Sequence, residues 1–169
     1  MSTGNLADVL SGSFTRPNDT TAYASGDLVA NNTTAASVVA VSLTGATNNL
    51  GAKGRIERVR LSKSTVSTTN AQFRVHLFNA APVTITNGDN GVFSVSGVAG
   101  YIGSFDVTMG QAFTDGAFGV GVVSSAAGTS AIFVAASGSS TLYALVEARA
   151  AYTPVAEEVF TVKAEVLRY

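Results

Sequence analysis

Few residues in this 169-residue chain could carry nucleophilic or acid–base chemistry. There is one histidine, His76, and there is no cysteine. A serine nucleophile normally needs a neighbouring base. His76 lies two residues after Arg74 in an alternating apolar and polar segment, and a cation on the same face favours a neutral imidazole. We therefore expect His76 to be a strand residue that faces solvent or packs at a subunit contact, and we predict no catalytic residues and no enzyme activity.

Metal ligands are also too sparse for a familiar site. One histidine without cysteine cannot form a typical zinc site, and the acidic residues are dispersed along the chain. The one local cluster of oxygen ligands is the sequence NGDNG at Asn87–Gly91, which lacks the carboxylates and the downstream glutamate of an EF-hand loop. Asn-Gly and Asp-Asn-Gly are typical of tight turns. We interpret this segment as a turn, with a weak calcium site as the alternative, and predict no metal and no cofactor.

The clearest charge feature is a basic cluster from Lys53 to Arg74. It holds six of the ten basic residues and one acid, Glu57, in a chain whose net charge is -1. It is either a solvated strand face whose charges discourage edge aggregation or a surface that docks on an acidic protein. Nucleic acid is a less favoured partner, because the aromatic residues of a single-strand platform are missing. The candidate docking residues are Arg16, Arg55, Arg58, Arg60, Lys63 and Arg74.

These residues must be positioned by strands, because apolar and polar residues alternate along most of the chain. From Gly54 to Lys63 neither face is consistently apolar, and a β-bulge near Glu57 and Arg58 would bring Ile56, Val59 and Leu61 to one side. The Gly-, Ala- and Ser-rich residues 113–130 predict a long loop. Strands are expected at about residues 13–16, 22–29, 37–44, 54–63, 71–78, 91–95, 101–108, 131–136, 141–148 and 160–166.

Many short strands separated by turn residues are typical of a β-sandwich or barrel. No second composition regime divides the chain. We predict an all-β, single-domain, jelly-roll-like β-sandwich at residues 14–169, preceded by a flexible N-terminal arm at residues 1–13. Tyr143 and Leu145 share the outer face of one expected strand, where a neighbouring chain could cover them.

A membrane span is not expected. Residues 116–146 contain no charged residue, but glycines and serines interrupt them, and their longest apolar run is Ala131–Ala136. The first residues, MSTGNLADVLSGSF, have neither the cationic region nor the apolar core of a signal peptide. We expect synthesis in a cytoplasm and no membrane partner.

Several segments resemble small head proteins of tailed bacteriophages, and the similarity runs from about Ser13 to Leu167. The segments are FTRPNDTTAY (14–23), SGDLVAN (25–31), GRIERVRLSKS (54–64), NAQFRVHLFNAAP (70–82), NGDNGVFS (87–94), GYIGSFDV (100–107) and TLYALVEARAAYTP (141–154). The resemblance implies a virion structural protein, namely a capsid decoration or cement protein with a jelly-roll-like fold on the outside of the head. It brings no catalytic residues.

The implied partners are the major capsid protein and further copies of the chain, as a homotrimer at threefold or quasi-threefold positions. The implied location is the exterior of the virion, after synthesis in the host cytoplasm. No nucleic acid is expected as a partner. Two alternatives remain open: a tail-fibre or receptor-binding β-module, and a minor head-completion protein.

Overall fold

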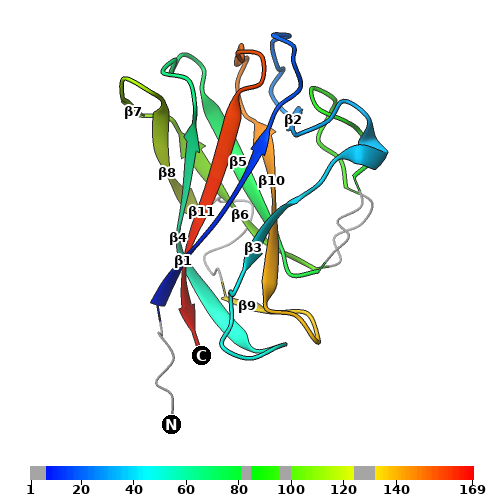
Figure 1. Cartoon of the computed structure of the whole chain (residues 1–169), viewed down its shortest axis with the longest axis vertical. Coiled ribbons are helices and arrows are strands. Elements are labelled where there is room, and N and C mark those ends of the chain that lie inside the picture. The colour runs from blue at the N-terminus through cyan, green and yellow to red at the C-terminus, as the bar shows by residue number, and fades with distance from the viewer. Residues whose placement is uncertain (1–6, 81–84, 96–99, 124–131) are drawn as a thin grey trace.

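A computed structural model describes residues 7–80, 85–95, 100–123 and 132–169. Figure 1 shows long curved strands that roll around one core. The strands are β1 (Ala7–Thr15), β2 (Leu28–Val29), β3 (Val41–Thr44), β4 (Lys53–Lys63), β5 (Gln72–Phe78), β6 (Tyr101–Thr108), β7 (Gln111–Ala112), β8 (Ala117–Val123), β9 (Ile132–Val134), β10 (Thr141–Ala148) and β11 (Val159–Arg168). A short 3-10 helix, η1, spans Ala35–Ser37. Within the described residues, no helix is long and apolar enough to cross a bilayer.

The order of the strands is that of a jelly roll. The hydrogen-bonded path is β1-β11-β4-β8-β6-β5-β10-β2, and β3 also pairs with β10. Eight of the described strands have four or more residues. If these eight strands are renumbered 1 to 8 along the chain, the path β1-β11-β4-β8 becomes 1-8-3-6. The path β6-β5-β10-β3 becomes 5-4-7-2. This order interleaves two antiparallel Greek keys, as a jelly roll requires, so the prediction of a single-domain, all-β sandwich is confirmed.

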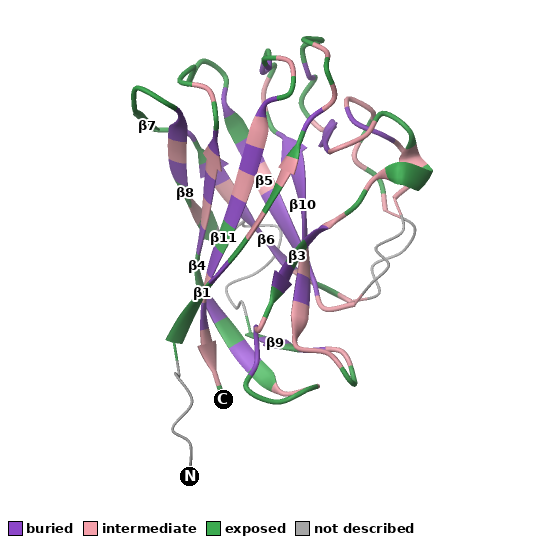
Figure 2. Cartoon of the chain, viewed as in Figure 1, coloured by how far each residue is buried: buried purple, intermediate pink, exposed green. Residues whose placement is uncertain are grey.

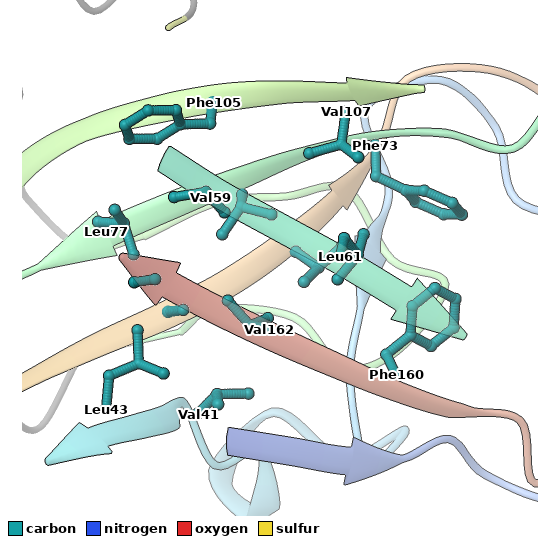
Figure 3. Close-up of a cluster of buried hydrophobic side chains, with 14 of the residues drawn as sticks. Val41, Leu43, Val59, Leu61, Phe73, Leu77, Phe105, Val107, Phe160 and Val162 are labelled. Atoms are coloured by element: carbon teal, nitrogen blue, oxygen red, sulfur yellow. The ribbon is translucent and has the colours of Figure 1, made fainter. Parts of the chain in front are cut away.

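The two halves form the two layers of the sandwich. We call β1, β11, β4 and β8, with β7 and β9, the β4 sheet, and β6, β5, β10 and β3, with β2, the β5 sheet. The rings of Phe73 on β5 and Phe160 on β11 meet edge to face at 5.3 Å between centroids. Figure 3 shows the side chains that fill the space between the layers, including Val59, Leu61, Leu77, Phe105, Val107 and Val162.

The predicted bulge in β4 is confirmed. Arg58 pairs with Glu165 and Ile56 pairs with Val166, so Glu57 is the extra residue on β4. The bulge reverses the facing of the strand after Ile56, as an inserted residue must. Ile56, Val59 and Leu61 consequently all lie in the core.

The prediction of a flexible arm is wrong for residues 7–13, which belong to β1. This strand pairs with β11 over nine positions, from Ala7 with Leu167 to Thr15 with Val159. Its side chains gave little signal, because only Leu10 is buried and the middle of the strand is Ser-Gly-Ser. The strand is specified by backbone pairing with β11 and by Phe14, whose ring stacks on Phe160 at 5.6 Å. Residues 1–6 lie outside the described residues.

The prediction of a loop at residues 113–130 is also wrong in part, because β8 occupies Ala117–Val123. The glycines of this segment favour a loop when the sequence is considered alone, but in the structure they permit close packing between strands. A Cβ on Gly119 would lie 2.4 Å from the carbonyl oxygen of Thr108, closer than any real contact. Residues 124–130 lie outside the described residues. Several expected strands are shorter than predicted: 22–29 contracts to β2, 37–44 contracts to β3, and 91–95 forms only isolated bridges at Val92 and Val95.

The outer side of the β5 sheet is covered by the chain itself. Leu28, Phe78 and Leu145 are buried in a second apolar cluster, against which parts of residues 38–40 and 85–95 pack. Figure 2 shows β10 buried along most of its length. The expectation that a neighbouring chain covers Tyr143 and Leu145 is therefore wrong, since Phe93, Val95 and Ile85 lie in the same cluster.

Candidate docking surface

The outer side of the β4 sheet is open in the described structure. Its central strand, β4, has β11 on one edge and both β8 and β9 on the other. β8 pairs with Val59–Lys63 and β9 pairs with Lys53–Arg55, so the two short strands follow each other along one edge of β4. We call the outward side chains of β4, β8, β9 and β11 the open face. Figure 1 shows where these four strands run.

An apolar column stands on the open face beside β4. Its members are Val120, Val122, Ile132 and Val134, all exposed. Val120 lies opposite Arg60, Ile132 opposite Arg55, and Val134 opposite Lys53. Sequence reasoning missed the column because half of it lies on β8, in a segment interpreted as a loop.

The arginines of the open face are held by carboxylates. Arg58 donates to Glu165 through Nε and Nη2, both at 2.9 Å, and Arg60 Nη2 lies 2.9 Å from Glu165 Oε1. Arg55 forms an ion pair with Glu57. Five cations, Lys53, Arg55, Arg58, Arg60 and Lys163, thus share the face with two carboxylates, a surplus of three positive charges. The predicted basic face is present at Arg55, Arg58 and Arg60, but it is partly neutralised.

Lys63 does not belong to this surface, because it points into the protein. Its ammonium group donates to Glu158 Oε1 at 3.1 Å and to Thr65 Oγ1 at 2.7 Å. Tyr152 donates its hydroxyl to the same carboxylate, at 2.7 and 2.8 Å. Burial lowers the pKa of Lys63, although Glu158 opposes this shift. The alternation of β4 carries Lys63 to the same side as Leu61, and its role is structural.

Arg16 is likewise buried and does not form part of a docking surface. Its Nη2 donates to Asp89 Oδ2 at 2.8 Å, and its Nε donates to the Tyr23 hydroxyl. Tyr23 donates in turn to Asp89 Oδ1 at 2.7 Å, and the backbone N–H of Ala30 donates to the same oxygen at 2.7 Å. Burial raises the pKa of Tyr23, which keeps its hydroxyl a donor.

The NGDNG segment is a turn, as predicted. The N–H of Gly91 donates to the carbonyl of Gly88 at 3.1 Å, and Asn90 adopts a φ of 61°. The turn points Asp89 inward to Arg16, a role that the sequence alone did not reveal. Among the described residues there is no group of three or more His, Cys, Asp or Glu residues that could hold a metal ion.

Arg74 lies on β5, in the other sheet, and its partner Asp106 on β6 lies opposite Val122 at the border of the open face. It pairs with Asp106 on the adjacent strand β6, with Nε to Oδ1 at 2.6 Å and Nη2 to Oδ2 at 3.1 Å. Of the six candidate docking residues, the structure therefore brings together only Arg55, Arg58 and Arg60. The chain segment that contained the basic cluster crosses from one layer to the other between β4 and β5.

His76 is covered by its own chain rather than facing solvent or another subunit. Its Nε2 lies 2.8 Å from Glu147 Oε2, its Nδ1 lies 3.3 Å from the Tyr101 hydroxyl, and its ring stacks on Phe93 at 4.2 Å. Arg149 also donates to Glu147, at 2.7 Å. Both ring nitrogens are engaged in these contacts, so His76 is part of the packing on the outer side of the β5 sheet, which the chain itself covers.

The environment of Glu147 predicts a pH-dependent contribution to stability. Burial alone would raise the pKa of Glu147, but hydrogen bonds from His76 and Arg149 outweigh burial and hold this pKa below its usual value of 4.5. A carboxyl whose pKa is lowered by folding stabilises the fold above its unfolded pKa, and this contribution is lost as pH falls through the folded pKa. We expect Glu147→Gln to be about 1 kcal/mol less stable than the wild type at pH 7, with the difference shrinking below about pH 4.5.

Urea denaturation at neutral and acid pH measures this difference. The exposed Asp115 provides the control, as Asp115→Asn should leave stability unchanged at both pH values. If the stability difference between Glu147→Gln and the wild type were the same at pH 7 and pH 3, the partners of Glu147 would not stabilise its ionised carboxylate.

Two solved phage capsid structures are similar to the chain. One is described as the "Cyanophage Pam1 capsid asymmetric unit", with a TM-score of 0.39 and 15% identity over 100% of this chain and 89% of the other. The other, "Capsid of Ralstonia phage GP4", has a TM-score of 0.41 and 17% identity over 96% and 85%. Similarity at this level assigns neither a family nor a function. No protein-family model and no curated protein sequence matches the chain.

Proposed function

We propose that this is a virion structural protein that decorates the outside of a tailed-phage head. The observation that carries the proposal is the contrast between the two sides of the sandwich. The chain covers the outer side of the β5 sheet with its own residues, whereas the open face presents four exposed apolar side chains. A grouped apolar patch rimmed by polar residues is typical of a protein contact surface. The resemblance to small phage head proteins supports the head as the place of that contact.

In this proposal the protein acts by lowering the free energy of the assembled shell when it binds. A protein that binds only the mature shell stabilises that shell by mass action, because each bound copy favours the lattice it recognises. The partner would be the major capsid protein. Copies would assemble as homotrimers at threefold or quasi-threefold positions, in keeping with the closed symmetry of most oligomers.

The number of copies per particle tests this function. Particles of the phage that encodes the chain would be purified, and the copy number measured by quantitative gel against the major capsid protein. Decoration predicts on the order of hundreds of copies, since the sites repeat with the shell lattice. A count of about three, six or twelve would contradict decoration and favour a tail-fibre or head-completion protein, which follow the symmetry of the tail or of one vertex.

A further inference from the structure

We propose that the open face binds an acidic protein surface on the shell, with the apolar column at its centre and the cations of β4 and β11 beside it. The identity of the partner as a shell protein rests on the function proposed above. The choice of this face, and of an acidic partner, rests on how apolar and charged residues are distributed over the described structure.

The apolar column differs from other exposed apolar residues because its members lie on two strands, β8 and β9, that both pair with β4. Val122 is 67% exposed on β8, where it lies opposite Asp106 of β6, and Ile132 is 58% exposed on β9, where it lies opposite Arg55 of β4. Val39, which is also 67% exposed, lies alone in a connecting segment. Single exposed apolar residues are ordinary, whereas a grouped set marks a surface that excludes water on binding. The column therefore supplies the apolar centre that a protein interface requires.

The charges on the open face select an acidic partner. The face has a surplus of three positive charges, whereas the whole chain has a net charge of -1. Two copies joined through this same face would bring two positive surfaces together, which is unfavourable. An acidic surface would instead complement Lys53 and Lys163, which form no ion pair within the described residues.

The arginines are ordered before the partner arrives. Glu165 lies between Arg58 and Arg60 and holds both guanidinium groups over the sheet. Side chains that are already ordered lose less conformational entropy on binding. The same ion pairs argue against nucleic acid, since phosphate contacts depend on cations that are free to replace the counterions of the polymer.

A pair of valines with equal exposure provides the sharpest test. Val122→Asp places a negative charge in the column, and Val39→Asp places the same charge at an equally exposed site elsewhere. Purified full-length protein would be titrated onto heads that lack it, and binding measured by sedimentation. We expect Val122→Asp to bind at least about tenfold more weakly than the wild type, with Val39→Asp unchanged. Lys163→Glu should also weaken binding, and added salt should weaken the wild type.

The outcomes separate the two proposals. If the wild-type protein does not sediment with heads, the proposed function fails. If the wild type binds and folded Val122→Asp binds equally well, the assignment of the open face is overturned while decoration stands. A dimer of the free protein that Val122→Asp abolishes would identify a second copy as the occupant and overturn the acidic partner. If the protein were retained on duplex DNA and Lys163→Glu abolished that retention, the acidic protein partner would be overturned in favour of nucleic acid. Thermal unfolding checks that each variant is folded.

Discussion

Replacing Asp89 with alanine is expected to lower the free energy of unfolding by about 3–5 kcal/mol. Asp89 accepts hydrogen bonds from Arg16, Tyr23 and the backbone of Ala30, and both charged side chains of the pair are fully buried. Removal of the carboxylate leaves the guanidinium of Arg16 without its buried counter-ion, and this uncompensated charge is the main cost. The loss is a large part of the roughly 5–15 kcal/mol that stabilises an ordinary domain.

Urea denaturation of Asp89→Ala and of Asp115→Ala measures this effect. Asp115 is an exposed residue in the turn before β8, so its replacement should change stability by less than about 0.5 kcal/mol. If the two substitutions had similar small effects, Asp89 would not hold the Asn87–Gly91 turn to Arg16 in the manner described.

The second large effect is expected at Lys63. Lys63→Met should destabilise the protein by about 3 kcal/mol, because Glu158 would remain buried as an unpaired carboxylate. The double variant Lys63→Met/Glu158→Gln should be more stable than Lys63→Met alone. It contains no buried charge at this site, and the amide oxygen of Gln can still accept the Tyr152 hydroxyl.

Chemical denaturation of the wild type, both single variants and the double variant forms a double-mutant cycle. A double variant that is as unstable as Lys63→Met would mean that the loss comes from packing around the lysine stem rather than from an unpaired charge. The two buried pairs are also joined physically, since the rings of Tyr23 and Tyr152 stack at 6.5 Å. When a substitution in one pair is combined with a substitution in the other, their effects on the free energy of unfolding should therefore be non-additive.

The strand pattern and the bulge were predictable because both depend on local alternation. Ile56, Val59 and Leu61 can share one side of β4 only if a residue is inserted between them, and this requirement is visible in ten residues of sequence. Strand β8 escaped prediction because Gly119 and Gly121 contribute no side chain to an alternating pattern. The need for glycine comes from the closeness of β6, a tertiary contact.

The basic cluster was misjudged for a related reason. Between Lys53 and Arg74 the sequence contains one acid, Glu57, which pairs with Arg55, but the other acids that neutralise the cluster come from distant parts of the chain. Glu165 is 107 residues from Arg58, and Glu158 is 95 residues from Lys63. Antiparallel pairing of β11 with β4 brings these residues together, so a local count of charge overstated the basic surface. The same pairing leaves the open face with only a modest positive surplus.

Electron cryomicroscopy of intact heads would show whether the protein decorates the shell through its open face. We predict density for this jelly roll at repeated positions on the outside of the shell. Within it, β4, β8 and β9 should lie against acidic residues of the shell protein, with Val122 and Ile132 removed from solvent. Density in which this face points to solvent would contradict the docking role of the face, and copies confined to a tail or a single vertex would contradict decoration.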